Sequence, residues 1–208
     1  MRQFTIFVFL LLIIQISFAQ DYNGQDIINR ANGLLKNKVG ENVIEFYRFE
    51  LQSYYEYRDS GNTKWKKLRP KRNLKGKFLA AQICFSFHHP AYNYDFVNKF
   101  TYIMLDSLLN LTNEPFVDFI PEFIRNNQPS NWLVDSEIDK IIKRQNLIKT
   151  KYTLIKRLEF DNKSRKNNWV VVNTLFEDDG FSEVEILTID PVTGDVLEHK
   201  QEKQYVCK

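Results

Sequence analysis

Hydrophobic and polar positions in the first half of the chain follow one helix and then several strands. Apolar residues at 27–39 recur every three or four positions, which predicts a helix with one buried face that ends at Gly40. From 47 to 58 apolar and polar side chains alternate, which predicts one long half-buried strand. The pattern that follows predicts a turn at 59–62, a basic loop up to Lys77, and strands at 78–87 and 96–105.

The second half repeats this order. Residues 135–148 have helical spacing, and Asp135 or Ser136 is the expected N-cap. Alternation then predicts a strand at 152–160, followed by a polar, basic turn at 162–168. Further strands are expected at 169–176, 181–189 and 195–203, with a tight turn at 190–194. The sequence therefore predicts an α+β fold of two tandem units, each with one helix packed on an antiparallel sheet.

A connector at 110–132 separates the two predicted units and contains three of the six prolines. Its many apolar residues predict that it packs against the fold, and a short helix near 119–125 would fit this pattern. We therefore divide the chain into a leader at 1–19, an N-terminal unit at 20–109, the connector, and a C-terminal unit at 133–208.

The leader has the pattern of a secretory signal peptide. Arg2 is the only charge before Asp21, and a nearly unbroken apolar run follows it at 4–14. Small residues at 17 and 19 place cleavage after Ala19. A retained membrane anchor is the alternative, but a spanning helix needs about 20 apolar residues and this run is shorter. We therefore expect a secreted or periplasmic protein with no transmembrane segment in the mature chain.

Three segments in the last third of the chain form a strand, a second strand and a hairpin: Trp169-Val-Val-Val, Glu185-Ile-Leu-Thr-Ile-Asp and Pro191-Val-Thr-Gly-Asp-Val-Leu. This pattern resembles the PepSY-like group of small secreted α+β domains. The tandem arrangement is also similar to bacterial inhibitor proteins built from two helix-plus-sheet repeats. The resemblance implies a non-catalytic domain that binds or restrains another protein, and it supplies no catalytic residue.

The two cysteines, Cys84 and Cys207, both remain after the predicted cleavage. An even pair in an exported chain makes a disulfide between them one interpretation. The alternative is that Cys84 is a buried thiol within an apolar strand, while Cys207 lies near the end of the chain.

Candidate residues for catalysis or metal binding are few. His88 and His89 are adjacent, and neighbours on a strand point to opposite faces, so we do not expect them to bind one metal ion. Asp118 and Glu122 would share a helix face if the connector is helical there, and a solvated face explains them. Acidic residues at 177–180 lack the spacing of a calcium loop and fit a hairpin turn. No nucleophile motif or phosphate-binding loop is present, so we predict no enzyme, metal or cofactor.

One charged segment differs from the rest of the chain, whose formal net charge is only +3. No acidic residue occurs between Ser60 and Tyr94, and this stretch carries Trp65 among basic residues: Lys64, Lys66, Lys67, Arg69, Lys71, Arg72, Lys75 and Lys77. Residues 177–202, in contrast, hold nine acids and one Lys. The basic segment is a candidate binding site for an anionic glycan or an acidic protein surface. We favour the alternative of a long solvated hairpin loop, because charge runs usually mark solvated faces.

The sequence thus favours an exported, non-catalytic binding protein of the cell envelope, an inhibitor or assembly partner of another protein. Its expected partner is an envelope protein or an anionic glycan, and export with a low net charge disfavours nucleic acid. Two alternatives stay open. One is a small secreted hydrolase or metal-dependent enzyme in which folding brings His88 and His89 to acidic residues. The other is a cystatin- or NTF2-like cone that encloses a small apolar ligand.

Overall fold

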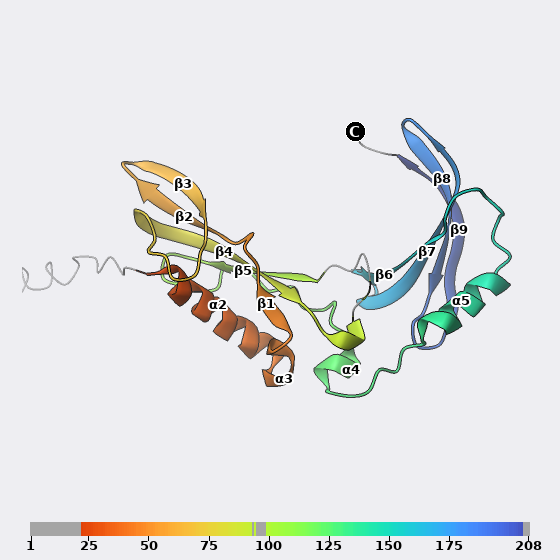
Figure 1. The fold of residues 1–208 in the computed structure, drawn as a ribbon, viewed down its shortest axis with the longest axis horizontal. Helices are drawn as coiled ribbons and strands as arrows, with labels where there is room; N and C mark the ends of the chain where they lie inside the picture. The colour runs from red at the N-terminus through yellow and green to blue at the C-terminus, as the bar shows by residue number, and fades with distance from the viewer. Residues whose placement is uncertain (1–21, 93, 95–98, 206–208) are drawn as a thin grey trace, which may run out of the picture. The chain divides into compact units, whose positions relative to one another are not determined.

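The computed structural model describes residues 22–92, 94 and 99–205. It combines helices with two antiparallel sheets, which confirms the α+β class (Figure 1). The predicted leader, its cleavage site and Cys207 lie outside the described residues. The chain forms two compact units: unit 1 combines the chain up to Leu34 with Glu50–Cys84 and Ile103–Glu114, and unit 2 combines Leu35–Phe49, Phe85–Tyr102 and the chain from Pro115 onward. The predicted domain boundaries stay a prediction.

Helix α2 (Gly24–Val39) begins and ends at residues suited to capping. Asn23 accepts hydrogen bonds from the main-chain N–H groups two and three residues ahead, at 2.8 and 3.1 Å. In the reciprocal bond, the Asp26 carboxylate accepts from the N–H of Asn23 at 3.0 Å. At the other end Gly40 has a φ of 89°, and its N–H donates to the Lys36 carbonyl at 2.8 Å. This confirms the predicted stop, and the short helix α3 (Glu41–Ile44) follows.

The first sheet has the strand order β1-β4-β2-β3, with β5 also paired to β4. Its strands are β1 (Tyr47–Phe49), β2 (Tyr54–Asp59), β3 (Asn62–Lys67), β4 (Lys77–Phe87) and β5 (Phe100–Leu105). Within unit 1, the core includes the fully buried side chains of Ile27, Leu68 and Ile83.

The single long strand predicted at 47–58 is wrong, because β1 and β2 are separate strands. Seven positions separate Tyr47 from Tyr54, but five separate their partners Phe87 and Gln82 on β4. The two surplus residues form a turn in which the Ser53 hydroxyl donates to the Glu50 carbonyl at 2.7 Å and accepts from a β4 main-chain N–H at 2.9 Å. A polar residue at an inward position of the alternating pattern therefore stabilises the break.

The basic segment is also not simply a loop, because it begins with strand β3. Ser60 and Gly61 join β2 to β3, and both have positive φ, at 50° and 83°. Two such residues form the tight turn whose twist matches a β-hairpin. All six residues of β3 are exposed, so the burial pattern that identifies a half-buried strand from sequence is missing here.

The second sheet is a meander with the order β6-β7-β8-β9 (Figure 1). Its strands are β6 (Ile155–Asp161), β7 (Lys166–Asp178), β8 (Phe181–Ile189) and β9 (Val196–Tyr205). Both sheets are antiparallel, but their strands follow different orders. Asp190 and Gly194 close the predicted turn at 190–194 with a 3.0 Å main-chain hydrogen bond, which confirms this hairpin.

Several element boundaries in the second half differ from those predicted. Helix α5 (Asp135–Arg144) begins after Val134, whose N–H donates to the Glu137 carboxylate at 3.0 Å, so Asp135 is the first helical residue and not the cap. The helix ends before Ile148, which is 45% exposed. The predicted turn at 162–168 is shorter, because β7 already includes Asn167 and its neighbour as buried residues.

The connector contains a short helix, α4 (Glu122–Arg125), which is shorter than the predicted one. Its Phe123 and Ile124 are buried, as are Phe119 and Ile120 just before it, so this segment packs within unit 2. None of the helices in the described part of the chain is long and apolar enough to cross a membrane.

Candidate functional site

The basic residues of unit 1 gather on β3 and on the segment that follows it. We call this set the basic surface: Lys64, Lys66, Lys67, Arg69, Lys71, Arg72 and Lys75. Six of its members are exposed and Arg69 is half-buried, and the Trp65 side chain beside them is 55% exposed. Lys77, the last basic residue of the run, already belongs to β4.

Strand β3 sorts its side chains onto two faces. Lys64 and Lys66 lie across from Tyr57 and Tyr55 of β2, whose rings are buried. Because directly paired residues share a face, these two lysines stand at the rim of the buried face of the sheet. Trp65 and Lys67 stand on the opposite face. Both faces of the strand therefore carry a positive charge.

The segment after β3 is held against the sheet and helix α2 by main-chain groups. The N–H of Leu68 donates to the Ser53 carbonyl at 2.8 Å, and the Leu68 side chain is fully buried. The Arg72 carbonyl accepts from the N–H of Gly24 at 2.9 Å, and the N–H of Lys75 donates to the Tyr55 hydroxyl at 3.1 Å. The side chains of this segment are solvated, but its backbone is fixed.

A close approach explains why glycine occupies position 24. A Cβ atom there would lie 2.0 Å from the Arg69 carbonyl oxygen, a distance that no side chain tolerates. The start of helix α2 and the basic segment thus fit against each other only because Gly24 has no side chain.

The basic surface is electrostatically unbalanced. Among the described residues Lys64 is within ion-pair range of Asp59, at 3.7 Å, and the other six cations have no carboxylate within that range. Partial desolvation, together with the nearby charges of Lys75 and Arg72, lowers the pKa of the Lys66 ammonium. Like charges that repel one another are thus held close together, an arrangement that an anionic ligand would stabilise.

Among the described residues, no acidic cluster surrounds the pair His88 and His89. His88 Nε2 lies 2.7 Å from the Ser86 hydroxyl, but Ser86 is only 3% exposed. The His89 ring packs against Phe46 and Phe87, and its Nδ1 accepts from the Ala91 N–H at 3.1 Å. Burial lowers the pKa of His89. Within the described part of the chain no three His, Cys, Asp or Glu side chains are placed to hold a metal ion.

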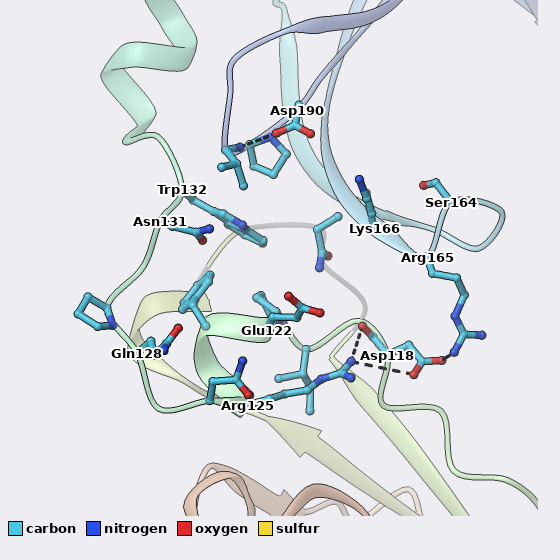
Figure 2. A pocket seen from close by; sticks show the side chains of 18 residues that line it. Asp118, Glu122, Arg125, Gln128, Asn131, Trp132, Ser164, Arg165, Lys166 and Asp190 are labelled. Carbon is cyan, nitrogen blue, oxygen red and sulfur yellow. Dashed lines mark hydrogen bonds and ion pairs between the residues drawn. The ribbon is translucent and has the colours of Figure 1, made fainter.

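A cavity of about 520 Å³ lies in unit 2, around helix α4 (Figure 2). The connector is not helical at Asp118, which precedes the helix, so Asp118 and Glu122 do not share a helix face. Instead Asp118 forms an ion pair with Arg165 and lies 4.0 Å from Arg125, whose guanidinium also donates to the Asp118 carbonyl at 2.8 Å. The Asp118 carboxylate, which is 27% exposed, is thus engaged by two guanidinium groups from separate segments. Trp132 forms part of the opposite wall.

Sequence reasoning missed Asn167, which also lines this cavity. Its Oδ1 accepts from the Tyr92 hydroxyl and its Nδ2 donates to the Phe119 carbonyl, each at 3.0 Å. All three residues are buried. The available signal was a pair of asparagines directly before an apolar run, which resembles a turn as closely as a strand.

Sequence reasoning also missed a buried carboxylate on β8. Glu185 is 4% exposed and accepts from Asn173 at 2.8 Å, from the N–H of Ile148 at 2.9 Å and from His199 at 2.9 Å. Burial alone would raise the pKa of Glu185, but the hydrogen bonds outweigh burial, and its pKa is lowered. This network fixes the segment after helix α5 to the second sheet.

Two further predictions can be placed. The turn predicted at 177–180 is shorter in the structure, because Glu177 and Asp178 end strand β7 and only Asp179 and Gly180 form the turn to β8. Cys84 is fully buried, and its Sγ accepts from Gln52 Nε2 at 3.1 Å. The disulfide with Cys207 stays a prediction, because Cys207 lies outside the described residues.

The fold and these sites define an α+β protein with a fixed basic surface and a separate charged cavity. No family model, curated protein or solved structure matches the chain. The PepSY-like resemblance therefore stays a prediction.

Proposed function

We propose that this is an exported, non-catalytic binding protein of the cell envelope that uses its basic surface to hold an anionic partner. The predicted signal peptide supports export, and the resemblance to PepSY-like and tandem inhibitor proteins supports a role in binding or restraining another molecule. The partner is an acidic envelope protein or an anionic glycan.

One observation carries the proposal: Lys66, Arg72 and Lys75 are held together by backbone hydrogen bonds, without a neutralising carboxylate among the described residues. Lysines that serve solubility alone are free to spread apart, because their long side chains gain entropy and avoid repulsion. Here hydrogen bonds fix the backbone at Arg72 and Lys75, and both cations lie close enough to Lys66 to lower its pKa. Preorganised charges of this kind lower the entropic cost of binding.

The direct test compares two variants of equal charge. In one, Lys66, Arg72 and Lys75 are changed to Gln; in the other, the exposed lysines of unit 2 are changed to Gln: Lys140, Lys143 and Lys149. Binding to immobilised poly-glutamate and to dextran sulfate is measured at several salt concentrations. We expect the first variant to lose about tenfold or more in affinity, and the control to retain wild-type affinity.

Wild-type binding should also weaken steeply with salt, because the charges involved are exposed. Equal binding by both variants would assign the effect to overall charge and overturn the proposal. The absence of binding to both polymers at low salt would overturn it as well.

A further inference from the structure

Strand β3 is an edge of the first sheet, and this gives the basic surface a second property. In the order β1-β4-β2-β3 it pairs with β2 on one side only, and no other described strand pairs with it (Figure 1). Alternate N–H and C=O groups along its other side therefore face outward and can pair with a further strand. All six residues of β3 are exposed, so access to this edge is open within the described structure.

The side chains of β3 define which strand would fit. In a strand added beside β3, alternate residues would lie directly across from Lys64 and Lys66, about 5 Å away. Acidic side chains at those positions would form cross-strand ion pairs, and Arg72 and Lys75 would extend the positive field beyond the strand. The residues in between would lie across from Trp65 and Lys67, where an apolar side chain can pack on the exposed indole.

Charge also determines which strands are rejected. Lysines on an edge strand are a common protection against pairing with another copy of the same edge, because like charges placed opposite each other repel. The same lysines do not oppose an acidic strand. The edge of β3 thus discriminates by charge between association with itself and association with an acidic partner.

We propose that the partner of the basic surface is an extended acidic segment of another polypeptide, which adds as a strand beside β3. This rests on the proposed function, and it specifies both the class of partner and the way it binds. Main-chain hydrogen bonds to β3 supply affinity, and alternating acidic side chains supply selectivity. An anionic glycan would use the charges but not the edge.

The probe is a synthetic peptide of about eight residues in which Glu alternates with Thr or Val, with blocked ends. Two control peptides have the same sequence but carry N-methyl groups on alternate residues, in opposite phases. These keep the charge and remove the N–H groups that a paired strand needs. Binding is followed by Trp65 fluorescence, with a Trp65→Phe variant as the blank, and by hydrogen exchange at the amides of Asn62–Lys67.

Strand addition predicts that the unmodified peptide binds, slows exchange at outward-facing β3 amides and shifts Trp65 emission. At least one methylated peptide should bind about tenfold more weakly, because it cannot complete the ladder. Changing Lys64 and Lys66 to Gln should weaken binding by a comparable factor, while the Lys140, Lys143 and Lys149 control should not.

Each other outcome overturns a specific statement. Equal binding of all three peptides, lost when the basic surface is neutralised, would overturn strand addition and leave the proposed function standing. Binding of dextran sulfate but of none of the peptides would do the same and identify a glycan-type ligand. Peptide binding that is unchanged by neutralising the basic surface would overturn both proposals, as would no binding of any anion.

Discussion

The hydrogen bonds of Asn167 allow a quantitative test of how unit 2 is held together. Burial raises the pKa of Tyr92, so its hydroxyl stays protonated and donates to Asn167 Oδ1 at 3.0 Å. The Phe119 carbonyl can only accept, which requires that the amide Nδ2 points toward it, also at 3.0 Å. The orientation of the amide is therefore determined by its two partners.

Changing Asn167 to Ala removes both bonds and leaves a buried hydroxyl and a buried carbonyl without partners. Each lost bond contributes about 1 kcal/mol, and each orphaned group adds a desolvation cost, so we expect a loss of about 2–4 kcal/mol in the free energy of unfolding. Tyr92→Phe removes one of these bonds and should cost about 1 kcal/mol. The double variant should cost less than the sum of the single variants by about 1 kcal/mol, the coupling of a direct contact.

The assay is urea unfolding followed by fluorescence in a Trp65→Phe background. Trp132 and Trp169 then report on unit 2, and the ring of Trp132 lies 6.1 Å from that of Tyr92. A cost below about 0.5 kcal/mol for Asn167→Ala, which is typical of a solvated surface position, would refute the described network. Strict additivity in the double variant would refute the direct bond between Tyr92 and Asn167.

Three further results are expected. Gly24→Ala should destabilise unit 1 by about 1–3 kcal/mol and expose the basic segment to trypsin. Gly33→Ala lies in the same helix, where an added Cβ meets no atom within 4 Å, and should stabilise the protein by about 0.5–1 kcal/mol. Equal effects of the two variants in urea unfolding would contradict the close approach at Gly24. The folded pKa of Glu185 is below its ordinary value of 4.5, so the stabilisation from its carboxylate is present above that pH and is lost as the pH falls through the folded pKa. The free energy of unfolding of the wild type should therefore decline below about pH 4.5 more steeply than that of Glu185→Gln. Parallel pH profiles of the two proteins would contradict this. Lys66→Gln should raise the urea midpoint, most clearly at low salt, and a lower midpoint would show that Lys66 repulsion is absent.

The fold was predictable where one interaction dominates a segment. The apolar stripe of helix α2 and the glycine stop at position 40 predict the same helix, and the Asn23 cap that begins it was found only in the structure. The hairpin at 190–194 similarly depends on local turn chemistry alone, and it was placed correctly. Prediction failed at β3, whose six exposed residues have no apolar alternation, because its strand conformation depends on pairing with β2 rather than on burial.

The sites were only partly predictable, for a related reason. The composition of the basic surface can be read from the sequence, but its fixed backbone cannot, because that depends on Gly24 and Tyr55 from distant parts of unit 1. Asn167 and Glu185 are polar residues whose burial is compensated by partners far along the chain. No local pattern distinguishes such a residue from one in a solvated turn.

The charges of Glu185 and Lys66 differ in whether the protein itself compensates them. The buried carboxylate of Glu185 accepts three hydrogen bonds from donors within the protein, and these compensate the cost of removing its charge from water. The charged neighbours of Lys66 are the cations Lys75 and Arg72, so no described residue compensates the charge of its ammonium group. Neutralising Glu185 should therefore weaken the fold, whereas neutralising Lys66 should strengthen it and weaken binding. If Lys66→Gln raises the urea midpoint and at the same time weakens binding of the anionic probes, Lys66 serves a ligand rather than the fold.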